Sequence, residues 1–189
     1  MYGVIFDFLR GYVLEKHGGE STWNALLKAN GYNYKIFFPV TEYDDSEIVG
    51  LAVAASEALD VPLPAVLEDF GVYVGHKLIS FYHMYVSNKD WKTFDIIENA
   101  HTCIHHAVHK HNSLRKPPVV KAMRESNDLL VIRYYSERKL CAVLKGIVRG
   151  LGEVFGEEFQ VEEVKCMHDG ERECIINVHR LYLGDVSRM

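Results

Sequence analysis

Apolar residues recur every three or four positions through most of the first half of the chain, which is the pattern of helices with one buried side. In the opening segment they are Val4, Ile5, Phe8, Leu9, Tyr12 and Val13. Gly18 and Gly19 end this helix, and Ser21 or Thr22 is the expected cap of a second helix that reaches about residue 30. Three more helices are predicted over 46–59, 62–86 and 89–111. The helix over 62–86 is expected to bury Leu67, Gly71, Val74, Leu78 and Phe81.

The period changes to two after the prolines at 117 and 118. Strands are predicted over 119–124 and 129–135, followed by a helix over 140–155. A hairpin of 158–167 with 174–178 is expected to turn at Asp169 and Gly170. This order predicts an α+β fold in a single domain over 1–189. A helical N-terminal subdomain (about 1–62) would pack on a C-terminal subdomain (about 63–189) that holds an antiparallel sheet and a helix, and the two prolines would form a hinge.

Composition argues against several classes of function. The 189 residues carry a formal net charge of −5 and no long basic run, so nucleic acid is not an expected partner. No apolar stretch approaches the roughly 20 residues that span a bilayer, and the first residues lack the basic start of a signal peptide. We therefore expect a cytoplasmic protein without membrane contact, whose four cysteines are thiols or metal ligands. No nucleophile–base pair, phosphate-binding glycine loop or pair of catalytic carboxylates is evident, so an enzyme is not expected.

Five of the ten histidines lie in the predicted helix over 89–111. Among them His101, His105 and His109 are spaced by four and share one side of a helix. Two histidines at this spacing can bind one metal ion, although a solvated helix surface explains the same pattern. A metal-dependent enzyme built on His101 and His105 is a further alternative, for which no neighbouring acid or base is evident.

A second group of polar residues ends the strand over 129–135. Because a strand alternates its sides, Tyr134, Ser136 and Arg138 point the same way. Two hydroxyls and a guanidinium suit a ligand with two carboxylates, since arginine pairs with carboxylates through two hydrogen bonds. A polar strand edge, with Arg138 paired to an acid such as Asp45, is the alternative.

This Tyr-x-Ser-x-Arg string resembles the haem-carboxylate motif of the H-NOX (haem nitric oxide/oxygen binding) domains, and YYSER is similar to the β subunit of animal soluble guanylate cyclase. The opening MYG, the segment YDDSEIVGLAVAASEAL at 43–59, Phe70-Gly71, and a histidine-rich segment before two prolines resemble the family in the same order. The resemblance covers essentially the whole chain, as in bacterial standalone members. It implies a haem b, with its iron, held between the two subdomains.

The resemblance also implies roles for individual residues. The string IHHAV at 104–108 matches the setting of the family's proximal histidine, so His105 is the implied iron ligand, with His101 and His106 as rivals. Tyr134, Ser136 and Arg138 would bind the haem carboxylates. Asp45 would orient Arg138, and Pro118 would press on the porphyrin. The gas-binding side would be lined by Ile5, Leu9, Val74, Leu78, Val143 and Ile147.

That apolar lining implies the choice of gas. Oxygen-binding members of the family carry a tyrosine at the position that Val143 matches. Bound oxygen benefits from a hydrogen-bond donor and nitric oxide needs one far less, so the resemblance implies a sensor of nitric oxide that also binds CO and not O2. Release of His105 when nitric oxide binds would shift the protein between two packings. The implied partner is a separate signalling protein, either a histidine kinase or a cyclic-dinucleotide enzyme.

Three cysteines form the last group. Cys166 and Cys174 flank the turn of the predicted hairpin, and Cys141 lies early in the preceding helix. With His168, or with Glu163, they would complete a tetrahedral zinc site, and some bacterial H-NOX proteins that this segment resembles carry such a site linked to thiol oxidation. Reduced thiols without metal explain the sequence equally well. The alternative function is therefore a zinc/thiol redox sensor in which haem is secondary or absent.

Overall fold

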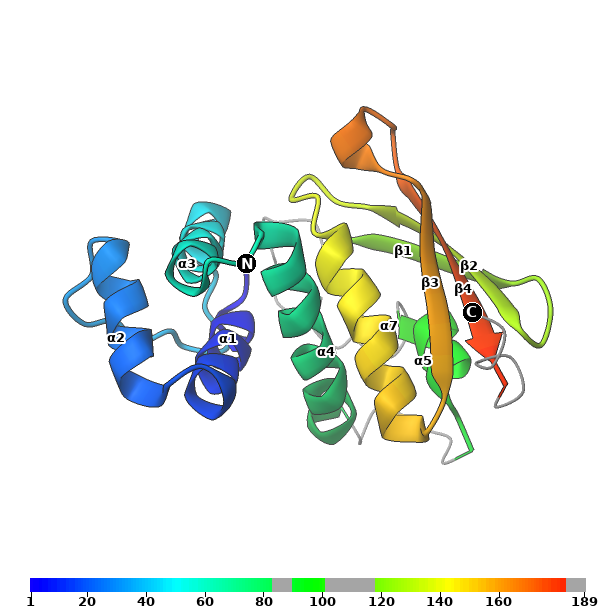
Figure 1. The fold of residues 1–189 in the computed structure, drawn as a ribbon, viewed down its shortest axis with the longest axis horizontal. Helices are drawn as coiled ribbons and strands as arrows, with labels where there is room; N and C mark the ends of the chain where they lie inside the picture. The colour runs from blue at the N-terminus through cyan, green and yellow to red at the C-terminus, as the bar shows by residue number, and fades with distance from the viewer. Residues whose placement is uncertain (83–89, 101–117, 183–189) are drawn as a thin grey trace.

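The computed structural model describes residues 1–82, 90–100 and 118–182 (Figure 1). The N-terminal half is helical, with α1 (Gly3–Lys16), α2 (Gly19–Ala29), α3 (Asp45–Leu59), α4 (Leu63–Tyr82) and α5 (Thr93–Ala100). The C-terminal half contains β1 (Val119–Arg124), β2 (Leu129–Tyr135), α7 (Cys141–Phe155), β3 (Glu158–Lys165) and β4 (Cys174–Leu181). The prediction of an α+β fold is therefore confirmed.

The four strands form one antiparallel sheet in the order β1-β2-β4-β3. In its register Tyr134 of β2 lies between Val120 of β1 and Cys174 of β4. The β3–β4 connection contains a 3-10 turn, Met167–Asp169, followed by Gly170 at a φ of 92°, a left-handed conformation that favours glycine. The hairpin therefore turns where the sequence predicted.

Two helix starts show how local residues set the elements. The side chain of Asp44 accepts a hydrogen bond from the backbone nitrogen of Ser46 at 2.9 Å, so α3 begins with an ordinary cap. The predicted cap of α2 at Ser21 or Thr22 was wrong. Gly18, at a φ of 87°, turns the chain so that the helix begins at Gly19, and the Ser21 hydroxyl donates back to the Gly18 carbonyl at 3.0 Å.

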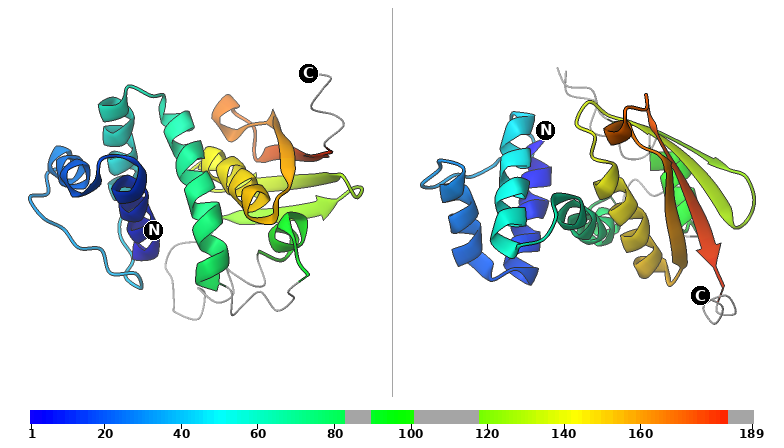
Figure 2. Two further views of the ribbon diagram at one scale, coloured as in Figure 1. Left: turned by 60° about the horizontal axis from the view of Figure 1, so that its bottom comes forward. Right: turned by 45° about the horizontal axis from the view of Figure 1, so that its top comes forward.

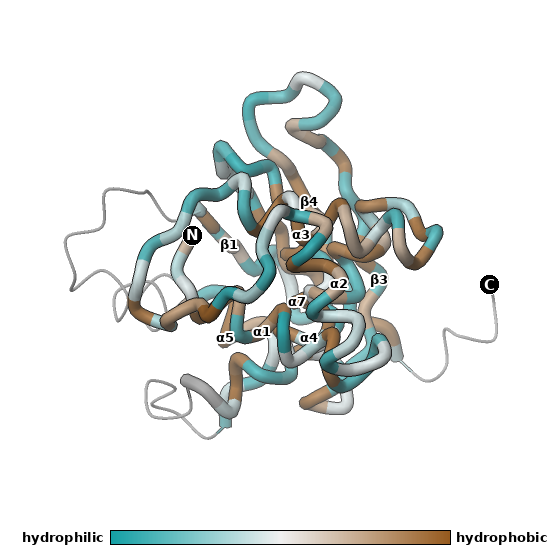
Figure 3. Tube along the Cα trace, turned by 90° about the vertical axis from the view of Figure 1, so that its left-hand side faces the viewer, coloured by the Kyte–Doolittle hydropathy of each residue, from teal (hydrophilic) through white to brown (hydrophobic). Residues whose placement is uncertain are grey.

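The elements stack in layers, with α4 and α7 between the sheet and helices α1–α3 (Figure 2). In Figure 3 apolar and hydrophilic positions alternate along most elements, as expected where one side is buried. One apolar core joins α1–α4, and a second joins α5, α7 and the sheet. Ile147 of α7 packs against both cores, so α7 connects them.

Helices α4 and α7 approach each other closely because glycines face glycines. An added Cβ at Gly146 would lie 2.0 Å from the carbonyl oxygen of Glu68 and 2.7 Å from the Cα of Gly71. One at Gly150 would lie 2.2 Å from the carbonyl oxygen of Val72. The buried side of α4 differs in part from the predicted one, since its most buried large residues are Val66, Phe70, Tyr73 and Val74. The reason is that α4 contacts other helices on two sides.

None of the helices in the described ranges is by itself long and apolar enough to cross a membrane. Taken together, α3 and α4 reach the required length and composition, but a bend of 110° separates them.

Candidate functional site

The hydroxyls of the predicted carboxylate-binding group are buried at the end of β2. Tyr134 is 4% exposed and Ser136 is 5% exposed. Burial raises the pKa of Tyr134, against the opposing effect of hydrogen bonds with Ser136 and the Leu140 backbone, so this phenol keeps its proton at neutral pH. The Ser136 oxygen accepts a hydrogen bond from the backbone nitrogen of Arg138 at 3.3 Å. The chain therefore supplies two buried hydroxyls next to an arginine.

The guanidinium of Arg138 is held by a carboxylate from a distant part of the chain. Its Nε donates to Oδ2 of Asp45 at 2.8 Å across 93 residues of sequence. Burial opposes ionisation of Asp45, but the Met1 amino group and Arg138 outweigh burial and hold the pKa of this carboxyl below its usual range. The structure thus places Asp45 against Arg138, where it fixes one edge of the guanidinium. The roles of both residues toward haem stay predictions.

The six residues predicted to line the gas-binding side gather around the core of α1–α4. Leu9 and Val74 are buried in that core, and the other four are partly buried and pack against it: Ile5, Leu78, Val143 and Ile147. They come from three helices, α1, α4 and α7. The tight crossing of α4 and α7 at Gly71 and Gly146 brings their two contributing walls together. None of these six side chains carries a hydrogen-bond donor.

The predicted iron ligand lies outside the described residues. His105, its rivals His101 and His106, and Cys103 all fall within 101–117. Pro118 is described, half-buried, directly before β1. The structure therefore defines where the chain enters and leaves this segment, at Ala100 and Pro118.

The three cysteines predicted to bind metal do lie together. The ligand atoms of Cys141, Cys166, Cys174 and Glu163 all fall within 4.8 Å of one another. The Sγ of Cys166 lies 3.8 Å from that of Cys141 and 4.0 Å from that of Cys174, so the three sulfurs form a compact triangle. His168 is not part of this cluster, because its Nε2 lies 2.9 Å from the carbonyl oxygen of Lys139.

Of the two residues predicted for the fourth place, the structure puts Glu163 in the cluster and not His168. It follows Phe159 and Val161 on the side of β3 that faces the core, and this period-two pattern is the sequence signal that identifies it. Burial opposes ionisation of Glu163, but the Lys145 ammonium, 3.0 Å away, outweighs burial and holds the pKa of the carboxyl below its usual range. The cluster therefore combines thiols with one charged carboxylate.

Two of the three thiols in this cluster, Cys141 and Cys174, are poor nucleophiles without a metal. Burial, with the negative charge of Glu163, raises the pKa of Cys141, and burial raises the pKa of Cys174 to about 11. Both thiols are therefore protonated at neutral pH. A metal ion would have to displace these protons in order to bind.

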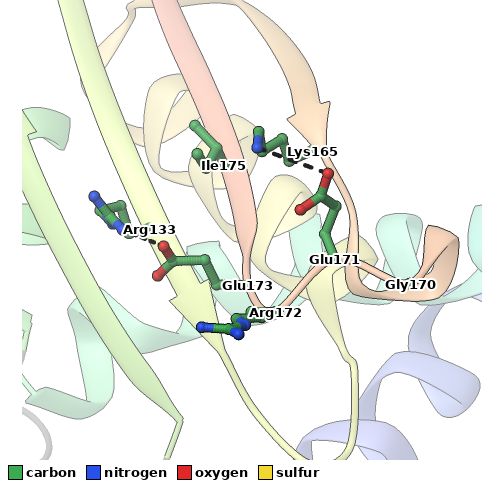
Figure 4. Close-up of a pocket in the computed structure, with 7 residues that line it drawn as sticks. All are labelled: Arg133, Lys165, Gly170, Glu171, Arg172, Glu173 and Ile175. Carbon is green, nitrogen blue, oxygen red and sulfur yellow. Dashed lines mark hydrogen bonds and ion pairs between the residues drawn. The ribbon is translucent and has the colours of Figure 1, made fainter.

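A hollow of about 430 Å³ lies on the side of the sheet away from α7 (Figure 4). Four of its five charged side chains are paired with one another: Arg133 contacts Glu173, and Lys165 contacts Glu171. The hollow shares no residue with the apolar wall or the hydroxyl–arginine group, so it has no part in the predicted site.

Comparison with known proteins connects this arrangement to a family. The chain matches the model of the haem-NO-binding (HNOB) family over residues 2–163. The crystal structure of an H-NOX protein from S. oneidensis in the Fe(II)NO ligation state superposes with a TM-score of 0.87 at 25% identity, covering 96% of this chain and 100% of that one. An oxygen-binding H-NOX domain related to soluble guanylate cyclases, in its oxygen complex, superposes with a TM-score of 0.82 at 20% identity and 96% coverage of both chains.

The soluble guanylate cyclase gcy-31 of Caenorhabditis elegans is 25% identical over 178 residues, which are 93% of this chain and 25% of the cyclase. The chain thus spans about a quarter of the length of that relative. Because the match covers only a quarter of the cyclase, it assigns no catalytic activity to this chain. The family match over 2–163 and the shared fold show that the chain belongs to the H-NOX family of haem-binding gas-sensor domains.

Proposed function

We propose that this chain is a haem-based sensor of nitric oxide, with His105 as the protein ligand of the iron. When bound, a haem would supply an iron that takes both a protein imidazole and a diatomic gas as ligands. The observation that carries the proposal is the group of Tyr134, Ser136 and Arg138. It offers two buried hydroxyls and a guanidinium oriented by Asp45.

This donor set fits the two carboxylates of a haem. The guanidinium offers N–H donors in a fixed fork, and Asp45 accepts from its Nε–H and so orients it; we assign this guanidinium to one haem carboxylate. The hydroxyls of Tyr134 and Ser136 would donate to the second. Because burial keeps the Tyr134 phenol protonated, it is a donor at neutral pH.

The aliphatic wall is the basis of the proposed gas selectivity. The side chains of Val74 and Val143 offer no hydrogen bond to a polar ligand, and neither do the other four residues of the wall. Bound oxygen would need a hydrogen-bond donor, and this wall would offer none, whereas nitric oxide and CO would need one far less. We therefore expect binding of NO and CO and no stable complex with O2.

The proposed signal is the release of His105. This residue would hold its segment to the haem, and its release on nitric oxide binding would be the event to which the rest of the chain responds. The freed segment, with Pro118 at its end, would then change its packing against the rest of the protein. A separate protein that distinguishes the two packings, a histidine kinase or a cyclic-dinucleotide enzyme, would read the change.

The experiment is an absorption spectrum of the reduced protein in argon, in air and after addition of NO. The proposal expects a red protein whose spectrum is unchanged by air and shifts with NO to the band position that reports loss of the imidazole. His105→Gly should give the imidazole-free spectrum, and His106→Gly should match the wild type. A pale protein despite ample haem, or an imidazole-bound spectrum in His105→Gly, contradicts the assignment.

A second function is favoured by the cysteine cluster. We propose that Cys141, Cys166, Cys174 and Glu163 bind one zinc ion, because their ligand atoms lie within 4.8 Å of one another and Glu163 Oε1 is buried without a hydrogen-bond partner among the described residues. Loss of the ion on oxidation would make this cluster a thiol redox sensor. Zinc content of the purified protein, measured before and after mild peroxide, tests it; absence of zinc from protein grown with zinc contradicts it.

A further inference from the structure

Helix α5 packs on the sheet through Phe94, whose ring lies close to Phe159 and to two arginines. Phe94 is fully buried and stacks on Phe159 of β3, with ring centres 5.3 Å apart. The guanidinium carbon of Arg180 lies 4.7 Å from the centre of the Phe94 ring, and that of Arg124 lies 5.5 Å away. Three strands thus hold the first turn of this short helix.

Arg124, the last residue of β1, also binds α5 through charge. Its terminal nitrogen donates to Oδ1 of Asp95 at 2.8 Å and to Oε2 of Glu98 at 2.7 Å. Burial opposes ionisation of Asp95, but the Lys92 backbone N–H and Arg124 outweigh burial and hold the pKa of this carboxyl below its usual range. Arg124 therefore forms ion pairs with two carboxylates that are about one helical turn apart on α5.

The start of α5 is held independently of Arg124. The backbone nitrogen of Thr93 donates to Oε2 of Glu157 at 3.1 Å, and Oε1 of Glu157 pairs with Arg180 at 3.0 Å. Glu157 is only 7% exposed at its side chain. Removing Arg124 would therefore loosen the end of α5 near Ala100 while its beginning stays attached.

The end of α5 is the point from which the chain continues to His105. Glu98 precedes His105 by seven residues, and β1 begins immediately after Pro118, where the same segment ends. We propose that Arg124 is a positioning residue for His105, because it ties the helix that enters this segment to the strand that leaves it. The inference rests on the proposed role of His105 as the iron ligand.

The physical reason is conformational entropy. A histidine that starts from a fixed point loses less freedom on binding a metal than one on a loosened chain. Without Arg124, the detached state gains more freedom than the attached one. His105 should then be released more readily.

The test compares Arg124→Gln with Arg133→Gln in the haem-loaded protein. Arg133 lies on the neighbouring strand, is ion-paired with Glu173 and does not contact α5, so the control makes the same change of charge. Stopped-flow absorbance after mixing with NO gives the rate at which the imidazole leaves. We expect about a fivefold faster release in Arg124→Gln, the size of effect of a partly exposed ion pair, and no change in Arg133→Gln.

Hydrogen–deuterium exchange supplies a second readout that does not need the gas. Amides of 96–100 should exchange about fivefold faster in Arg124→Gln, with amides of α7 unchanged, whereas a general loss of stability would affect both. Glu98→Gln removes one of the two carboxylates and should shift both measurements in the same direction by less. It also serves as the test if Arg124→Gln does not fold.

The outcomes separate the two proposals. Wild-type protein that takes up no haem overturns the proposed function and, with it, the role of Arg124 toward His105. A haem protein in which Arg124→Gln and Glu98→Gln release the imidazole at the wild-type rate overturns this inference alone. Faster release in Arg124→Gln and in the Arg133→Gln control alike overturns it as well, because the effect would then follow charge rather than the contact with α5.

Discussion

The close crossing of α4 and α7 can be tested by adding a single methyl group. In Gly146→Ala the new Cβ would lie 2.0 Å from the Glu68 carbonyl oxygen, whereas ordinary contact begins at 3.4 Å. It would also lie 2.7 Å from the Cα of Gly71. Both neighbours are backbone atoms, so neither can rotate away as a side chain would. The two helices must separate for the methyl group to fit.

The expected effect is a net loss of stability. Alanine favours a helix over glycine by about 1 kcal/mol. Overpacking a well-packed contact costs about 1–3 kcal/mol, and rigid backbone neighbours place this site at the upper end of that range. The gain in helix propensity offsets part of the overpacking cost. We therefore expect Gly146→Ala to lower the free energy of unfolding by about 1–2 kcal/mol. For a chain of this size the melting temperature would fall by about 2–8 °C.

Urea unfolding followed by circular dichroism measures this change, with Gly50→Ala as the matched control. Gly50 lies in α3, and an added Cβ there would meet only the amide tip of Asn30, which can move. The control should be neutral or slightly stabilising because it gains helix propensity without a backbone clash. A Gly146→Ala protein as stable as the wild type, alongside such a control, would refute the argument from backbone distance.

Two further predictions concern the sites. Asp45→Asn removes the carboxylate that pairs with Arg138, so the free energy of unfolding should fall by about 1 kcal/mol at pH 7. Because the pKa of Asp45 is lowered in the folded protein, this difference should be present above about pH 4 and disappear as the pH falls through the lowered pKa; urea titrations at pH 7 and pH 3 check it, and an equal difference at both would contradict it. Cys166→Ser removes the thiol that contacts both other cysteines, so zinc content should fall from about one ion per chain to none, as metal analysis would show. Unchanged zinc content in that variant would exclude the cluster as the site.

The local pattern of apolar and polar residues predicted most helices and strands of this protein correctly. The strands Val119–Arg124 and Leu129–Tyr135 begin and end where the period-two alternation predicts, because each has one side on the core. Alternation also orients Tyr134 and Ser136 alike, and both are buried. The prediction was less complete for α4, whose two contacting sides leave no single apolar stripe to recognise.

Contacts between distant segments were decided only by tertiary structure. The sequence offered Asp45 as a partner for Arg138, but the two are 93 positions apart and no periodicity in the intervening chain brings them together. The same holds for the fourth member of the cysteine cluster. His168 is closer in sequence to Cys166, yet Glu163 lies in the cluster because the strand turns it inward, while His168 follows the 3-10 turn toward Lys139.

The physical reason for this division is the distance along the sequence over which each kind of interaction acts. Helix and strand periods depend on neighbours a few residues apart, so a sequence displays them directly. The meeting of α4 with α7, of Asp45 with Arg138 and of Arg124 with α5 depends on how whole elements pack, which every residue in the contact surfaces influences at once.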